Sequence, residues 1–371
     1  MRNKSVAVLD IRSSEVCAAV GERGVNNTFI IKSKYTCSYD GYADGELLDV
    51  KNFCSAVEKV VKNTIAAAGE KFNRFYVGIP GEFLKVQVTD GGITFAAPQK
   101  IKATHTYAVA EMSEPRGEKD YSVIERSPVY YVLSDKRRVI DPIGCVTDGL
   151  RAKISWFLCK NTFAKSVVDA FKPFGQMRLK FVPSSLSESC YLLEPHVRDL
   201  YAALLDIGYI SSTFSVSRGN GVIFNQAFSV GVGHIAAFLM DELEVPFDVA
   251  TQLMSEVNLN AISNPAAVTE VRYGDMIYSY QTSALCEIIS EGLDGICDMV
   301  EECRRSFTEK DLAGKPIYIT GEGVKSIRGL VEHLSGRLGC VVNVVAPKVP
   351  YYDKPKFSSL FSLLDAALSD D

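Results

Sequence analysis

Two short segments, one in each half of the chain, carry groups that could hold a phosphate. In each, an aspartate at the end of an apolar run is followed by short hydroxyl side chains: Asp10 with Ser13 and Ser14, and Asp206 with Gly208, Ser211, Ser212 and Thr213. Backbone amides and hydroxyls bind phosphate oxygens, and glycine allows the backbone to come close to them. Carboxylates at strand ends can hold Mg²⁺ through water. Two such turns facing each other would enclose the phosphates of a nucleotide, with Asp10 and Asp206 on the metal side.

The first of these turns has an unusual residue in it. Arg12 stands where a glycine would let the backbone close on a phosphate. Its guanidinium could bind the phosphate itself, but a long side chain on a tight turn favours the alternative that it fills the space.

The elements around the first turn form the opening unit of an α/β domain. Short apolar runs predict strands over residues 6–11, 16–20 and 26–38, and "RFYVGIP" predicts another. Between them we expect a helix with Asp49 as its N-cap. Its apolar stripe consists of Phe53, Val57, Val60, Val61 and Ile65.

The same order of elements returns in the second half of the chain. "LYAALLDIGYISSTFSVSRGNGVIFNQAFSVG" has an apolar run ending at an aspartate, a Ser/Thr cluster and two further strands. Two copies of one strand–turn–strand motif predict a duplicated fold of two lobes with a cleft between them. The alternating segment between about residues 82 and 165 predicts an inserted α+β subdomain.

Composition excludes several other classes of protein. The 371 residues carry 40 basic and 45 acidic side chains and a net charge of −5, which argues against a nucleic-acid-coating protein. The ten cysteines include no CxxC pair, and the four histidines have no paired spacing, so we expect buried reduced thiols and no Cys/His metal site. No segment predicts a secretion signal or a transmembrane helix, and we expect a cytoplasmic protein.

The order of the motifs resembles the bacterial actin-like cell division protein FtsA across nearly the whole chain. "LDIRSSEVCAAVGE" is similar to the family's LDIGTTKV…GE, "VIDPIGCVTDGLRAKI" to its DPiGm.G.rLe signature, and "ALLDIGYISSTFSVSRGNGVI" to its DiGgGTTdi.v..nG. "IYITGEGVKSIRGLVE" resembles its adenosine-side LTGGgs.l.Gi.el. The resemblance implies an actin-like, ribonuclease-H-like duplicated two-lobe α/β fold with an FtsA-type inserted subdomain.

The resemblance also implies a division of the chain. The first lobe covers 1–82 and 166–200, the insert 83–165, the core of the second lobe 201–228 and 308–345, its outer subdomain 229–307, and a return to the first lobe 346–371. The nucleotide positions it implies are Asp10, Arg12, Ser13, Ser14, Asp206, Gly208, Ser211, Ser212, Gly231, Gly321, Glu322 and Gly323.

The chain departs from the family where a nucleotide should bind. Besides Arg12, Tyr209 and Ile210 occupy the family's glycine and small positions, and we expect their bulk to crowd the phosphate oxygens. The family's AExlK, whose charged residues contact the nucleoside, reads "ATQLM", with Thr251 and Met254 in the charged places. Four or five lost contacts of about 1 kcal/mol each weaken binding by several factors of ten. ATP and Mg²⁺ are therefore implied by the family but expected to bind weakly or not at all, and no Glu or Gln is placed to orient water for hydrolysis.

The resemblance further implies partners. One is the C-terminal tail of the tubulin-like division protein FtsZ, which the outer subdomain would bind. Another is a further copy of the chain, contacted through the insert in protofilaments. The others are division proteins at the inner face of the membrane. FtsA proteins carry a basic amphipathic helix that lies on the membrane. The end "KPKFSSLFSLLDAALSDD" is instead acidic, so we expect its stripe of Phe357, Leu360, Phe361, Leu364 and Leu368 to dock on the core. Membrane contact would then be indirect or through a helix outside this sequence.

Three functions remain open from the sequence. The first is a division scaffold with a degenerate cleft that links the FtsZ ring to the septal machinery. The second is an active actin-like protein that binds ATP and polymerises, and the third is an actin-fold adaptor of pilus-assembly or morphogenetic type. The changed turns favour the first over the second, and the DPIG-bearing insert favours both over the third.

Overall fold

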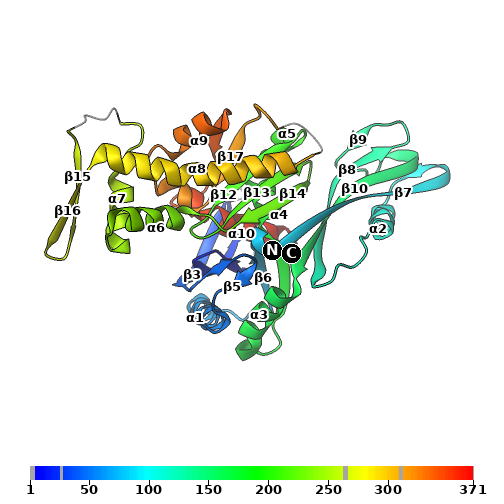
Figure 1. Ribbon diagram of the computed structural model, residues 1–371. Helices are drawn as coiled ribbons and strands as arrows, with labels where there is room; N and C mark the ends of the chain where they lie inside the picture. The colour runs from blue at the N-terminus through cyan, green and yellow to red at the C-terminus, as the bar shows by residue number, and fades with distance from the viewer. Residues whose placement is uncertain (1–4, 26–27, 262–265, 309–311, 371) are drawn as a thin grey trace.

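The structure is a computed structural model, and it describes residues 5–25, 28–261, 266–308 and 312–370. Two five-stranded sheets of the same design form the two lobes, and a third sheet extends from one end of the molecule (Figure 1). Among the described residues, no helix combines the length and the apolar content needed to cross a lipid bilayer.

The sheet of the first lobe has the strand order β11-β6-β1-β2-β3. Its strands are β1 (Val6–Ile11), β2 (Glu15–Arg23), β3 (Phe29–Ser38), β6 (Arg74–Ile79) and β11 (Arg178–Pro183). Strands β1, β2 and β3 pair antiparallel, whereas β6 joins β1 and β11 joins β6 in parallel. The expected strands are therefore confirmed over the described residues, and β2 runs longer than the apolar residues alone indicate. Residues 26 and 27 of the expected third strand lie outside the described residues.

Helices cover both faces of this sheet. On one face pack α1 (Val50–Ala68) and α3 (Asn161–Phe171). The expected α1 is confirmed, since Asp49 accepts hydrogen bonds from the backbone N–H groups of Lys51 and Asn52, and four of the five stripe residues are buried. Because α3 packs with α1, residues 161–165 belong with the first lobe and not with the insert as the sequence indicated.

The opposite face is covered by α4 (Ser184–Leu192) and by α10 (Ser358–Asp370). Leu360, Phe361 and Leu364 of α10 are fully buried against β1 and β2, and Phe357 and Leu368 are partly buried there. The prediction that the final helix docks on the core is confirmed. The chain thus returns to the first lobe after completing the second.

The sheet of the second lobe repeats the first, in the order β14-β13-β12-β17-β18. Its strands are β12 (Ala202–Ile207), β13 (Ser212–Arg218), β14 (Gly221–Phe228), β17 (Ile317–Thr320) and β18 (Val342–Val344). Asp10 and Asp206 hold matching positions, one residue before the end of β1 and of β12. The duplication expected from the sequence is present in the fold.

The helices and the hairpin of the second lobe are α5 (Pro195–Arg198), α6 (Val232–Leu243), α7 (Phe247–Glu256), α8 (Thr282–Ser306) and α9 (Leu330–Leu338), with β15 (Val268–Tyr273) and β16 (Met276–Gln281). The β15–β16 hairpin lies at the left end of the molecule in Figure 1. One large core joins α6, α7, α8 and α9 to the sheet, whereas Val197 of α5 packs against a separate small cluster with Leu193 and Leu204.

The inserted sheet has the order β7-β10-β8-β9 and lies at the opposite end (Figure 1). It consists of β7 (Leu84–Lys100), β8 (Tyr121–Leu133), β9 (Arg138–Val139) and β10 (Val146–Lys160), with α2 (Ala103–Met112) packed on one face. The short pair β4 (Tyr42–Ala43) and β5 (Glu46–Leu47) lies in the first lobe before α1. The remaining domain boundaries stay a prediction.

Candidate functional site

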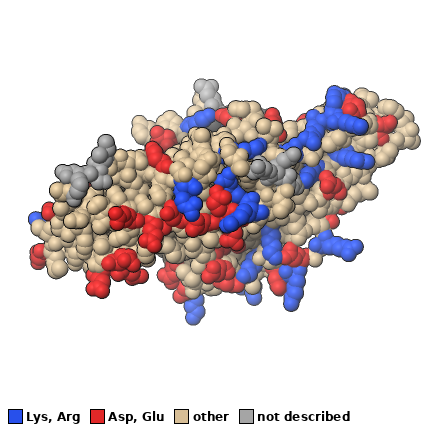
Figure 2. Space-filling model, turned by 45° about the horizontal axis from the view of Figure 1, so that its top comes forward, with Lys and Arg blue, Asp and Glu red and all other residues tan. Residues whose placement is uncertain are grey.

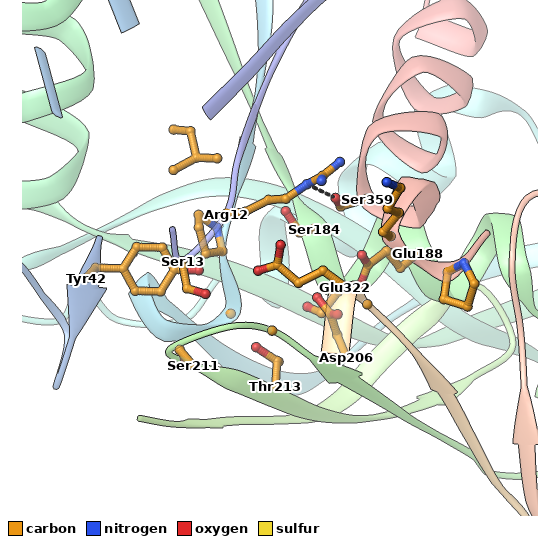
Figure 3. A pocket seen from close by; sticks show the side chains of 18 residues that line it. Arg12, Ser13, Tyr42, Ser184, Glu188, Asp206, Ser211, Thr213, Glu322 and Ser359 are labelled. Atoms are coloured by element: carbon orange, nitrogen blue, oxygen red, sulfur yellow. Dashed lines mark hydrogen bonds between the residues drawn. The ribbon is translucent and has the colours of Figure 1, made fainter. Parts of the chain in front are cut away.

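A small cavity lies between the two lobes, where the turns after β1 and β12 face each other (Figure 3). Eight of the sequence-predicted residues line it: Arg12, Ser13, Asp206, Gly208, Ser211, Thr213, Gly321 and Glu322. Of the remaining predicted residues, Asp10 and Ser14 contact these lining residues directly, as described below. The duplicated turns therefore form the two walls that the sequence indicated.

Arg12 is held inside this site by a network of the first lobe. Its Nε donates to Asp10 Oδ2 at 2.8 Å and to Ser359 Oγ at 3.2 Å, and its Nη1 donates to Glu15 Oε1 at 2.7 Å. Ser359, from the first turn of α10, also donates to Asp10 Oδ2 at 2.8 Å. Figure 3 shows the guanidinium directed at Ser359. Asp10 thus holds a cation and a hydroxyl supplied by the chain itself.

Ser13 connects the first turn to the second. Its Oγ accepts the backbone N–H of Tyr209 at 3.2 Å and that of Ile210 at 3.0 Å. Consecutive backbone N–H groups on a turn are the groups that would hold a phosphate oxygen. Here a hydroxyl of the opposite lobe occupies them.

A second set of contacts fastens the lobes around Glu82, which follows β6. Its carboxylate accepts hydrogen bonds from Ser211 Oγ, from Ser229 Oγ at 3.0 Å and from the backbone N–H of Gly45 at 2.9 Å. Close by, Asn225 Nδ2 donates to the carbonyl of Gly81 at 3.2 Å, and a Cβ on Gly81 would overlap Thr213. The lobes are therefore in direct contact on this side of the cavity.

The side chains of Tyr209 and Ile210 do not crowd the cavity, so that prediction was wrong. The Tyr209 ring packs against Gly233 at the start of α6, and the Ile210 side chain reaches across to Gly41 of the first lobe. Neither lines the cavity. Their contribution comes instead from their backbone N–H groups, which a pattern of side-chain types does not reveal.

The other predicted positions serve the packing of the second lobe. Ser212 is buried and donates to the carbonyl of Val230 at 2.7 Å. A Cβ at Gly231 would overlap backbone atoms of the second turn, and a Cβ at Gly323 would overlap the side chains of Val232 and Ile207. Met254 is buried in the core, and Thr251 Oγ1 donates to the carbonyl of Phe247 in its own helix. The residues in the nucleoside-contacting places are thus used within the protein.

Acidic groups dominate the electrostatics of the cavity. Glu322 accepts a weak hydrogen bond from Ser14 Oγ at 3.4 Å, which links the lobes once more. Burial, followed by the charge of Glu322, raises the pKa of Asp206 to about 7. Burial also raises the pKa of Glu322 above its usual range. Gly321, at a φ of 101°, allows the backbone to pass directly beside the Asp206 carboxyl.

Glu188 of α4 is a cavity residue that the sequence did not indicate. It is 3% exposed, its Oε1 has no hydrogen-bond partner, and burial followed by Asp206 and Asp10 raises its pKa well above the usual range. It lies one helical turn after Ser184, which lines the same cavity (Figure 3). The pattern "SSLSESCYLL" contains one acidic residue on a short serine-rich helix, and that was the available signal.

These residues do not fit a nucleoside triphosphate with Mg²⁺. The cavity has a volume of about 40 Å³, which is room for one or two water molecules, whereas small-molecule sites span about 300–1,000 Å³. Asp10 is already paired with a cation, and the amides of the second turn are already bonded. Burial and the neighbouring acids favour the protonated forms of Asp206, Glu188 and Glu322, and a protonated carboxyl is a poor metal ligand.

Comparisons with known proteins place this fold. No family model matches the chain. The chain is 22% identical over 378 residues to the cell division protein FtsA of Streptococcus pneumoniae serotype 2 (strain D39 / NCTC 7466), with 97% of this chain and 79% of that protein covered. It is 20% identical over 378 residues to FtsA of Bacillus subtilis (strain 168), with 99% and 84% covered.

Solved structures agree at the level of the fold. A chain of the PilM–PilN type IV pilus biogenesis complex matches with a TM-score of 0.65 and 13% identity, covering 98% of both chains. MreB5 of Spiroplasma citri bound to AMPPNP matches with a TM-score of 0.57 and 9% identity, covering 98% of this chain and 95% of the other. The fold is therefore actin-like.

Proposed function

We propose that this chain is a divergent member of the FtsA family of actin-like proteins, to which it is similar over nearly its whole length, and that it acts as a cell-division scaffold with a degenerate nucleotide cleft. In this role it links the FtsZ ring to the septal machinery at the inner face of the membrane. The observation that carries the proposal is that Ser13 of the first turn holds the two amides of the second turn at 3.0–3.2 Å, beside an Arg12 that is paired with Asp10. The backbone amides that would bind a phosphate and the Asp10 carboxylate that would hold the metal are therefore both bonded to groups of the protein itself.

Self-association of the scaffold is supported by charge. Residues 84–160, which contain the inserted sheet, carry 12 Lys and Arg against 9 Asp and Glu, whereas residues 229–307 carry 3 against 13. Figure 2 shows Lys and Arg gathered toward the end formed by the insert. Because the two segments lie at opposite ends of the molecule (Figure 1), a head-to-tail arrangement would bring unlike charges together.

A thermal-melting titration tests the cleft. A ligand at 100 times its dissociation constant stabilises the folded state by about 2.7 kcal/mol. We expect no change in the melting temperature of the full chain with Mg-ATP. The matched variant is Arg12→Gly with Ser13→Ala, which frees Asp10 and both amides, and we expect it to show a concentration-dependent rise. Saturable stabilisation of the unmodified chain would overturn the degenerate cleft.

A peptide-binding measurement tests the partner. We expect a fluorescently labelled C-terminal tail peptide of FtsZ to bind the full chain, with hydrogen-exchange protection confined to residues 229–307, and a scrambled peptide of equal composition not to bind. Equal binding of both peptides, or protection elsewhere, would contradict the proposed linkage.

One observation favours the second candidate function, an ATP-binding protein that polymerises. The turn formed by Gly321, Glu322 and Gly323 keeps its glycines and lies beside Asp206. The same Mg-ATP titration separates the two candidates, because only the second predicts stabilisation of the unmodified chain.

A further inference from the structure

A cluster of three potential metal ligands lies outside the cleft, in the second lobe. The ligand atoms of Asp294, Cys297 and His333 all lie within 4.8 Å of one another. Asp294 and Cys297 belong to α8, and His333 belongs to α9, which packs against α8 in Figure 1. Residues of two segments are thus brought to one point by helix packing.

The sequence positions these groups through the apolar faces of the two helices. Cys297 follows Asp294 by three positions, so both project from the same side of α8. Leu293, Ile296 and Val300 of α8 and Leu330 and Leu334 of α9 are buried in the shared core. His333, between the two leucines, therefore meets α8 at the edge of that core, and its Nε2 lies 2.9 Å from Asp294 Oδ1.

The donor set is one that suits zinc. A thiolate, an imidazole nitrogen and a carboxylate oxygen are its usual protein ligands, at about 2.0–2.3 Å in a tetrahedron. Such bond lengths place the ligand atoms about 3.3–3.6 Å from one another, so small side-chain movements from the present arrangement suffice. We propose that Asp294, Cys297 and His333 form a binding site for a zinc ion, with water as the fourth ligand.

Exposure allows a metal to enter. The side chain of Asp294 is 43% exposed and that of His333 is 20% exposed, whereas Cys297 is fully buried beneath them. The site therefore opens to solvent on the carboxylate side and has its thiol at the base. The acidic surplus of residues 229–307 raises the local concentration of cations around it.

A simple ion-pair ladder between the helices accounts for only part of this arrangement. One turn further along both helices, Arg337 Nη2 lies 2.6 Å from Asp298 Oδ1, which parallels the pair of His333 and Asp294. Arg337 Nε also lies 3.6 Å from Asp294 Oδ1, so it can hold that carboxylate as an outer partner. A ladder does not require Cys297, whose Sγ points to the same place as the other two groups.

Cobalt(II) titration of the full reduced chain tests the site, because a cobalt–thiolate bond gives a near-ultraviolet charge-transfer band. We expect one equivalent of Co²⁺ to produce the band and Zn²⁺ to abolish it. Cys297→Ser should remove the band, and His333→Gln, which keeps a hydrogen bond to Asp294, should weaken Co²⁺ binding by about 100-fold or more. The matched control Cys303→Ser, at another buried thiol of α8, should leave the band unchanged.

The readouts distinguish a metal site from a folding effect. Melting temperatures without metal show whether each variant folds, and Zn²⁺ should raise that of the unmodified chain and of Cys303→Ser but not that of Cys297→Ser. A band that persists in Cys297→Ser, or no band in the unmodified chain, would overturn the proposal.

Discussion

Arg12 is the residue on which the chemistry of the cleft depends. Its guanidinium is paired with Asp10 and Glu15, both from the first lobe. An arginine at this point supplies five donors in a fixed plane, so it can satisfy the carboxylates that would otherwise hold a metal through water. The arginine at this single position thus pairs with the carboxylates of the turn and takes the place of the metal ion that they would otherwise hold.

Replacing Arg12 by alanine should destabilise the protein by about 3 kcal/mol, because it leaves the carboxylate of Asp10 buried and unpaired. Urea denaturation measures the free energy of unfolding. Adding Asp10→Asn to Arg12→Ala should recover part of the loss, since the uncompensated charge is then absent. Additive losses in the double variant would show that the pair is not coupled.

The raised pKa of Asp206 predicts a pH dependence of stability. Burial, then Glu322, raises it from 3.8 to about 7, so between these values the folded state binds more protons than the unfolded chain. The stabilisation is fully present below the lower value and is lost as pH rises through the upper one. Asp206→Asn does not ionise, so its melting temperature relative to the unmodified chain should rise between about pH 4 and pH 7 and stay level above that. A difference that is independent of pH would contradict the shift.

The sequence predicted the residues of the turns better than their roles. Asp10, Ser13 and Asp206 are recognisable because an aspartate and hydroxyls follow an apolar strand. That Ser13 bonds the amides of Tyr209 and Ile210 could not be predicted, because the contact depends on how the two lobes close. Glu188 was missed for a similar reason: its position on α4 becomes meaningful only when α4 packs beside the cavity.

At the scale of elements, local sequence patterns were sufficient to predict those helices whose own residues define their ends and their buried face. The N-cap at Asp49 and the 3.6-residue period define α1, and the apolar stripe of α10 predicted its docking. The place of α3 was not predictable from its own residues, because Phe163 and Val167 fit any apolar partner and the packing with α1 selects the first lobe.

Asp49→Ala should cost about 1 kcal/mol of stability, because the N–H groups of Lys51 and Asn52 lose their acceptor. The matched control is Glu58→Ala, which removes the same charge from an exposed position in the same helix. Chemical denaturation of both variants provides the comparison. Equal losses would assign the effect to charge and not to capping.

Leu364→Ala in α10 should cost about 3 kcal/mol, because a fully buried leucine against β1 and β2 leaves a cavity when truncated. Leu368→Ala, one turn later and only partly buried, should cost clearly less. Thermal denaturation compares the two. A larger loss at Leu368 would contradict the docking of α10 as described.

At the scale of the whole molecule, hydrogen bonds from side chains connect the two lobes in addition to the covalent backbone. Ser13→Ala should increase the hydrogen-exchange rates of the Tyr209 and Ile210 amides, because their acceptor in the other lobe is lost. Mass spectrometry of the peptide that contains them measures the change. Ser14→Ala, whose hydroxyl makes only a 3.4 Å contact with Glu322, should change these rates little.

The hydroxyl of Ser13 behaves as a ligand that is tethered to its own receptor. A free anion that reaches the second turn competes with the Ser13 hydroxyl, whose effective concentration is set by the chain. The apparent affinity for the anion is the intrinsic affinity multiplied by the fraction of molecules in which the lobes stand apart. Any agent that separates the lobes, including a partner bound at either end, would therefore expose these amides without touching them.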